Sequence, residues 1–346
     1  MADDKTSFSR RTLLFAGGAM AAGITASSLV WGRHPEADEP EESQPLVGAF
    51  DMRTGSMRLE PSPLFYATGP QSFAFDDANG LIYALQTVAG DIQLPDENKP
   101  VSSTDRKRSG DMCLIQLSNS GEFLGHMILR GFGHGISFGV EPVDGRTNIW
   151  VEGKSEGKSG YGRSVARVRF KDGSVLDSSD SGVRHFDPLP GASHVTPALD
   201  LPGERMLVSH EEDGEQRFVV YGKADFLAER TGHAQPLEDG VQVKGEEFFQ
   251  GCVLHGDFVY VLTGGPYTGK EGNNPPGSGG NTYITAIDVR TGQTQARHHV
   301  TVAPDLPHRE PEGIAVSSAG PAPALCIGFS VKAKDHRQLT VYSFTA

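Results

Sequence analysis

An internal repeat restricts the fold of this chain more than any other feature of its sequence. Five segments share one pattern, in which a short alternating strand, a polar or Gly/Pro turn and a second apolar strand follow one another. The segments begin at Gln71, His134, Val195, Gln250 and Glu312. Consecutive starts lie 55 to 63 residues apart, and a near-constant period of this length is typical of repeat architectures such as propellers.

A second predicted hairpin follows three of these segments. The three hairpins span residues 113–124, 165–176 and 283–294, with Gly121, Gly173 and Gly292 in their turns. Glycine supplies the positive φ that tight hairpin turns require. Two hairpins in each period make a four-stranded blade, so the sequence predicts an all-β, five-bladed β-propeller with four-stranded antiparallel blades. The 43 glycines and 22 prolines are consistent with many short strands and turns.

The two ends of the repeat region are each incomplete. Residues 46–59 resemble the outer hairpin of a blade without its inner one, and residues 339–344 form a predicted strand without a partner. We therefore expect residues 45–346 to fold as one domain, in which N- and C-terminal strands share the last blade and close the ring.

The first residues read as an export signal. Arg10 and Arg11 precede an uncharged stretch at 13–30 that is rich in Ala and Gly, which predicts a twin-arginine signal peptide over residues 1–32. A membrane anchor is the alternative, although this stretch barely reaches spanning length. Residues 33–44 are predicted to be an acidic, disordered spacer. We expect a secreted or cell-wall-associated protein whose mature chain is monomeric and not stably inserted in a membrane.

Charge and cysteine content exclude several functions. With 31 Lys and Arg against 44 Asp and Glu, the formal net charge is −13, which disfavours nucleic acid as a partner. Cys113, Cys252 and Cys326 lie far apart, and we expect buried thiols while leaving one disulfide open. No zinc or calcium spacing is present, so we predict no metal and no cofactor, and leave open a structural or site-bound calcium ion.

The residues that open the five repeats are candidates for a ligand-binding site. The first strand of a propeller blade lines the central channel, and four of the five opening residues are polar: Gln71, His134, Gln250 and Glu312. The exception is Val195, where a small shift in register would present His194 instead. Polar residues at this level bind a ligand or, alternatively, only hydrate a water-filled channel.

Two further residues lie next to these positions in the sequence. Arg309 is predicted to hold an anionic group, and Tyr267, on the glycine-rich loop 264–281, is predicted to offer a stacking face. If the site is catalytic, we expect His134 to act as the base and Glu312 or Tyr267 as the acid.

Several of these motifs together resemble a known family. They are residues 71–77 (QSFAFDD), 125–135 (GHMILRGFGHG), 139–142 (GVEP), 249–251 (FQG), 280–283 (GNTY) and 309–315 (REPEGIA). From about residue 60 to its end the chain resembles the secreted actinobacterial proteins named teichoic acid biosynthesis protein C, which share a β-propeller domain with staphylococcal phage receptor-binding proteins that recognise wall teichoic acid. The resemblance implies a five-bladed propeller that contacts a cell-wall or extracellular polysaccharide; the segment at His194 is the least similar to the family.

Three functions are compatible with this sequence. The first is an exported module that binds a glycan or a teichoic acid-like polymer at the mouth of the channel. The second is a polysaccharide lyase or glycoside hydrolase that uses the same residues. The third is a protein-interaction scaffold. The charge of −13 disfavours a strongly anionic polymer unless Arg130, Arg163 and Arg309 cluster locally.

Overall fold

A computed structural model describes residues 46–243, 245, 247–270 and 272–345. These residues belong to one compact unit, Ser43–Ala346. The predicted signal peptide at 1–32 and the predicted spacer at 33–44 lie outside the described residues. None of the helices within the described ranges combines the length and apolar character needed to span a membrane.

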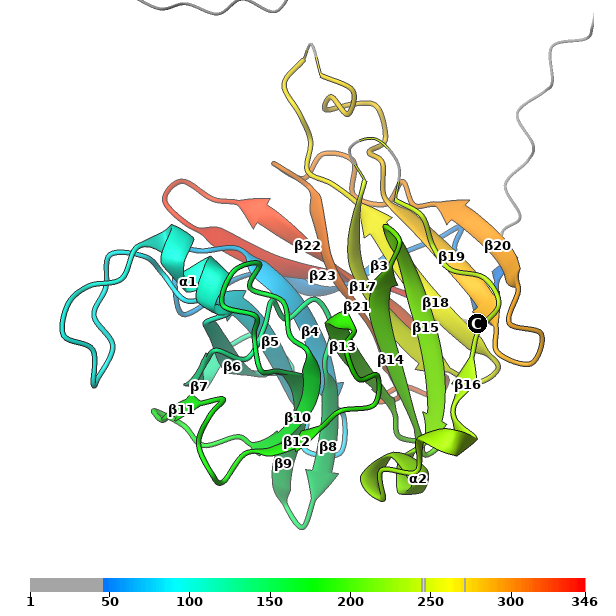
Figure 1. Cartoon of the computed structure of the whole chain (residues 1–346). Helices are drawn as coiled ribbons and strands as arrows, with labels where there is room; N and C mark the ends of the chain where they lie inside the picture. The colour runs from blue at the N-terminus through cyan, green and yellow to red at the C-terminus, as the bar shows by residue number, and fades with distance from the viewer. Residues whose placement is uncertain (1–45, 244, 246, 271, 346) are drawn as a thin grey trace, which may run out of the picture. The chain divides into compact units, whose positions relative to one another are not determined.

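Five four-stranded antiparallel blades surround a common channel, so the predicted five-bladed propeller is confirmed (Figure 1). Blade 1 contains β4 (Pro70–Asp76), β5 (Leu81–Thr87), β6 (Met112–Ser118) and β7 (Phe123–Arg130). Blade 2 contains β8 (Gly139–Val143), β9 (Arg146–Gly153), β10 (Ser164–Arg169) and β12 (Arg184–Phe186). Blade 3 contains β13 (Ser193–Asp200), β14 (Arg205–Glu212), β15 (Glu215–Gly222) and β16 (Gln235–Pro236). Blade 4 contains β17 (Phe248–His255), β18 (Phe258–Gly264), β19 (Tyr283–Asp288) and β20 (Thr294–His299).

Blade 5 is built from both ends of the chain. It contains β21 (Glu310–Ser317), β22 (Ala324–Lys332), β23 (Arg337–Thr345) and β3 (Ser56–Pro63). The blue β3 pairs antiparallel with the red β23, with Leu59 opposite Val341 (Figure 1). The predicted closure is confirmed, but the predicted outer hairpin is wrong in one respect: β1 (Leu46–Val47) and β2 (Phe50–Asp51) pair only with each other.

The hairpin predicted around Gly173 is also wrong. The strand that follows this turn, β11 (Val175–Asp177), runs parallel to β7 and adds a fifth strand to blade 1. The fourth position of blade 2 is taken by β12, which pairs with β10. Blades 1 and 2 are therefore linked through backbone hydrogen bonds at their outer edges. Three short helical segments complete the described structure: α1 (Ser103–Ser109), α2 (Lys223–Leu227) and the 3-10 turn η1 (Thr231–His233).

The apolar core is divided into five clusters, one between each pair of neighbouring blades. The alternation of each strand places one apolar row on each face of a blade, and each row packs against the next blade. Val195 belongs to the cluster between blades 2 and 3, together with Trp150. All three cysteines are free and buried in these clusters. Burial raises the pKa of Cys252 and of Cys326 to about 12, so both stay as thiols at neutral pH.

The closure of the ring can be tested on β3. Leu59 is 2% exposed and packs between blades 5 and 1, whereas Met57 on the same strand is 51% exposed. We expect Leu59→Ala to lower the free energy of unfolding by about 2–4 kcal/mol and Met57→Ala to leave it nearly unchanged. Urea denaturation of both variants measures this difference. Equal effects would show that β3 does not contribute its buried face to the closure.

Candidate ligand-binding site

β-bulges in the innermost strands position four of the predicted site residues. The register of the inner strand shifts once in each of four blades, at Gln71, at His194 and Val195, at Gln250, and at Glu312 and Gly313. A bulge leaves its extra residue outside the hydrogen-bonded ladder and redirects the side chain. His194 takes a left-handed backbone conformation there, with φ of 58°. As a result His194 lines a pocket while Val195 is fully buried.

Blade 2 supplies its polar residue, His134, from a loop and not from a bulge. Its inner strand β8 begins only at Gly139, and His134 lies in the preceding loop of residues 131–138. The prediction that His134 opens an inner strand is therefore wrong, although His134 still reaches the same end of the channel.

The buried carboxylate of Glu152 shapes this loop. Glu152 on β9 is fully buried and accepts hydrogen bonds from the backbone N–H groups of His134, Gly135 and Gly162, at 2.9, 3.0 and 2.9 Å. The Thr196 hydroxyl on β13 donates a fourth bond at 3.0 Å. A Cβ on Gly133 would collide with this carboxylate, which explains one of the glycines around His134.

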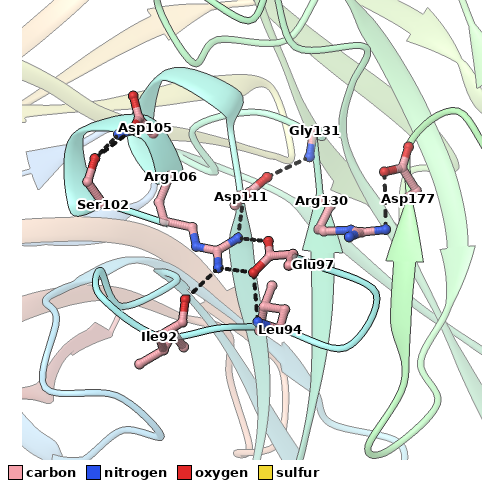
Figure 2. Close-up of polar contacts among 10 residues, drawn as sticks. All are labelled: Ile92, Leu94, Glu97, Ser102, Asp105, Arg106, Asp111, Arg130, Gly131 and Asp177. Atoms are coloured by element: carbon pink, nitrogen blue, oxygen red, sulfur yellow. Dashed lines mark hydrogen bonds and ion pairs between the residues drawn. The ribbon is translucent and has the colours of Figure 1, made fainter. Parts of the chain in front are cut away.

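The segment between β5 and β6 supports the start of the same loop (Figure 2). Arg106 on α1 is fully buried and donates hydrogen bonds to the carboxylates of Glu97 and Asp111. Asp111 in turn accepts a bond of 3.1 Å from the N–H of Gly131. The Gly110 carbonyl accepts bonds from the next two residues of the loop. This buried network, in which only the Nε of Arg106 lacks an acceptor among the described residues of the cluster, fixes the segment from α1 to the loop.

A cavity at this end of the channel, which we call the mouth pocket, has a volume of about 240 Å³. Nine residues line it: Gln71, His134, Ile136, Tyr161, Phe248, Phe249, Gln250, Glu310 and Glu312. The structure thus brings together the four polar residues that open repeats 1, 2, 4 and 5. The volume lies just below the range of roughly 300–1,000 Å³ for sites of drug-sized ligands, which suits a smaller group such as one sugar or polyol unit.

Glu312 has an unusual environment among these residues. It is only 7% exposed, and its carboxyl group has no hydrogen-bond partner within the described residues. Burial raises the pKa of Glu312 well above its ordinary value of 4.5, and the neighbouring charge of Glu310 raises it further, against smaller opposing effects of Arg337 and Lys107. Burial also lowers the pKa of His134, more than the charge of Glu152 raises it. The imidazole is therefore neutral at neutral pH.

Tyr161 connects the mouth pocket to a second cavity. Its ring lies between two imidazoles, with centroids 4.8 Å from His134 and 3.7 Å from His194. The second cavity, which we call the side pocket, has a volume of about 210 Å³. It shares Ile136, Tyr161, Phe248 and Phe249 with the mouth pocket, and adds His194, Thr196, Glu211, Gln216 and Val243. Because these four residues line both cavities, the two pockets adjoin at Tyr161.

Arg309 and Tyr267 do not line either pocket. Arg309 is 1% exposed, and its guanidinium donates to the carbonyls of Val300 and Val302 and to the hydroxyl of Thr282. Its predicted role at the mouth is therefore wrong, because these acceptors already use the groups that an anion would need. The Tyr267 hydroxyl donates to the carbonyl of Pro304 at 2.8 Å, so this ring is held away from the mouth pocket.

Sequence reasoning missed Glu152 and Tyr161. Glu152 is the only charged residue in the apolar run 149–153 (IWVEG), and Tyr161 stands between two glycines in 160–162 (GYG). Both patterns are signals that could have been read: a charge within a buried strand and an aromatic ring on a glycine-flanked loop. Among the residues that the structure describes, no group of three or more His, Cys, Asp and Glu side chains could hold a metal ion.

The fold and these pockets define a five-bladed β-propeller with a ligand-sized cavity at one end of its channel. The chain belongs to the family described as "Phage 5-bladed beta propeller receptor binding platform domain", whose model matches residues 70–343.

The chain is also similar to two known proteins. It is 25% identical over 287 residues to the Bacillus subtilis (strain 168) protein named "Putative major teichoic acid biosynthesis protein C", covering 79% of this chain and 59% of that protein. The solved tail fibre of Staphylococcus aureus phage P68 is 19% identical, with a TM-score of 0.61, covering 84% of this chain and 52% of the fibre chain. The chain thus spans little more than half the length of each, and the fibre similarity shows a shared fold alone.

Because Glu152 accepts four hydrogen bonds, we expect its replacement by glutamine to lower the stability of the protein. In Glu152→Gln one carboxylate oxygen becomes an NH₂ group, which at best faces the Gly135 N–H and the Thr196 hydroxyl, so at least one backbone donor is left without an acceptor. We expect the free energy of unfolding to fall by about 1–3 kcal/mol for each donor left without an acceptor. The control is Glu156→Gln, because the carboxylate of Glu156 pairs, among the described residues, only with Ser159 and Arg163 near the surface. Urea denaturation that gave equal values for both variants would contradict this role.

Glu312 predicts a pH-dependent stability. Because its folded pKa is raised, wild-type stability is lost as pH rises from the ordinary carboxyl pKa of 4.5 through the folded value. We expect Glu312→Gln to match the wild type near pH 4 and to exceed it by roughly 1–3 kcal/mol at pH 8. Thermal unfolding across this range measures the difference, with exposed Glu122→Gln as the control. A constant difference at all pH values would contradict the assignment.

Proposed function

We propose that the protein is an exported module that binds a hydroxyl-rich glycan of the bacterial cell surface at the mouth pocket. The observation that supports this most directly is the convergence of polar side chains from four blades on one cavity. Hydroxyl groups need acceptors and donors at fixed positions, and side chains on inner strands are held by the surrounding sheet.

The shape of the site supports a polymer rather than a small free ligand. The mouth pocket and the side pocket adjoin across Tyr161, and both include the exposed ring of Phe248. An exposed aromatic ring offers an apolar face to the C–H groups of a sugar. Two consecutive units of a chain would occupy the two pockets.

The similar proteins indicate which class of glycan should be tested first. The matched family carries a receptor-binding description, and the relative from Bacillus subtilis is named for teichoic acid biosynthesis. A wall polymer of the teichoic acid type is therefore the ligand class to test first. Export agrees with the paired arginines and the apolar stretch at 13–30, because a wall polymer is met outside the cytoplasm.

A second function, cleavage of the glycan, is favoured by one observation. Two carboxyl groups, those of Glu310 and Glu312, line the same pocket, and burial holds the pKa of Glu312 high. Carboxyl groups in unequal environments are typical of acid–base pairs in glycan cleavage. The neutral imidazole of His134 would then be the base in a lyase.

Binding can be tested by changing one amide. Gln250 is 8% exposed and lines the mouth pocket, so we expect Gln250→Ala to weaken binding to wall glycans and teichoic acids about tenfold, since one or two hydrogen bonds are lost. The control is Gln293→Ala, which removes an exposed amide bonded to Glu238. Affinity for each polymer is measured by calorimetry.

The same mixtures distinguish the functions. New reducing ends or unsaturated uronates would favour the second function. Equal affinities of Gln250→Ala and Gln293→Ala for a bound polymer would contradict binding at the mouth pocket. Neither binding nor product with any polymer would overturn the proposal in favour of a protein-interaction scaffold.

A further inference from the structure

We propose that the mouth pocket selects a primary ammonium group carried on a sugar or polyol unit, and that it rejects phosphate. This inference rests on the proposed function and names the ligand chemistry of the same site.

Four of the polar side chains that line the pocket, Gln71, Gln250, Glu310 and Glu312, carry hydrogen-bond acceptors, and His134 and Tyr161 can also donate. The amide NH₂ of Gln71 donates to the carbonyl of Pro70 at 2.9 Å, and that of Gln250 donates to the carbonyl of Gly264 at 3.3 Å. Backbone carbonyls accept only, so these contacts fix the amide orientation and leave both Oε1 atoms free to accept. The carboxyl groups of Glu310 and Glu312 add further acceptors. A primary ammonium group offers three donors and no acceptor, whereas phosphate offers mainly acceptors.

Glu312 supplies an unpaired acidic group. It is more than nine-tenths buried, it lines the cavity, and within the described residues no side chain or backbone group hydrogen-bonds to it. A buried carboxylate without a partner is costly. An ammonium group entering the pocket would provide the missing partner through a charge-assisted hydrogen bond.

The other charged groups around the pocket do not replace this partner. Glu310 is already held by His308, at 2.7 Å, and by Arg337, at 3.8 Å. Lys107 on α1 is exposed and, like Arg337, acts on Glu312 only through its field. No lysine or arginine is among the described residues that line the cavity. A phosphate would therefore face two carboxyl groups without a cation to hold it.

The apolar wall of the pocket also suits a cation. Phe248 is 56% exposed and Phe249 also lines the pocket, whereas the ring of Tyr161 is already stacked against His134 and His194. Aromatic faces attract ammonium groups, particularly where carboxylates stand nearby and water is partly excluded. The pocket thus combines hydrogen-bond acceptors with aromatic rings, a combination suited to an ammonium group.

Binding of an ammonium group should be linked to protons. Burial and Glu310 raise the pKa of Glu312 in the free protein, and a bound cation would lower it again. Binding then releases a proton, and affinity rises as pH rises toward the raised pKa of Glu312 in the free protein. Protonation of His134 at acid pH would add a positive charge to the pocket. It would also weaken binding of an ammonium group at low pH, as protonation of Glu312 does.

The experiment compares matched glycans. Glucosamine- and galactosamine-containing oligosaccharides are assayed by calorimetry before and after N-acetylation, beside nitrogen-free wall glycans and glycerol-phosphate oligomers. We expect the free amine to bind at least about tenfold more tightly than its acetylated form, because a charge-assisted bond is lost on acetylation. In Glu312→Gln this ratio should fall to near one, whereas exposed Glu122→Gln should keep it.

A second measurement needs no variant. Titration of the wild type with the amine in two buffers of different ionisation enthalpy should reveal proton release at pH 6, and none for the acetylated glycan. Equal affinities for the two forms, a ratio retained in Glu312→Gln, or a preference for glycerol phosphate would each overturn the ammonium site while leaving glycan binding intact. Absence of binding to every glycan would overturn the proposed function and this inference together.

Discussion

The buried carboxylate of Glu152 is the interaction on which the candidate site depends. Its four donors come from the loop of His134, the loop of Gly162 and the inner strand of blade 3 at Thr196. No lysine or arginine pairs with it in the described part of the chain. Its charge is held by backbone dipoles, so both loops of blade 2 must take their observed paths for this anion to be stable. The positions of His134 and Tyr161 follow from that requirement.

The polar groups at the mouth are tolerated because most of the stability of the propeller comes from contacts outside the candidate site. Apolar clusters between neighbouring blades and the pairing of β3 with β23 hold the ring closed. Three of the polar groups at the mouth, those of Gln71, Gln250 and Glu312, occupy bulges, where the inner strands have already left the regular ladder. A scaffold of this kind tolerates the unfavourable burial of Glu312, in the way that functional sites commonly reduce stability.

The sequence predicted the blades well because a repeat reports the same physical pattern five times. It also predicted four residues of the mouth pocket, since the repeat aligns their positions. It failed where the structure depends on single long-range contacts. The pairing of β11 with β7 joins two blades, and the burial of Arg309 depends on carbonyls of residues 300 and 302. Neither contact leaves a periodic signal, and the bulge that selects His194 over Val195 is a local change of register.

The negative charge of the mouth pocket is a better guide to its ligand than the names of the proteins that share its fold. A name associated with teichoic acid directs attention to phosphate, yet the mouth pocket presents Glu310 and Glu312, and the whole chain carries a net charge of −13. Long-range steering by such a protein favours cations and neutral groups over polyanions. A wall polymer that carries both phosphate and ammonium groups would be oriented by this field, with its ammonium groups directed to the carboxylates and its phosphates kept in water. The pocket would then recognise the substituent of the polymer rather than its backbone.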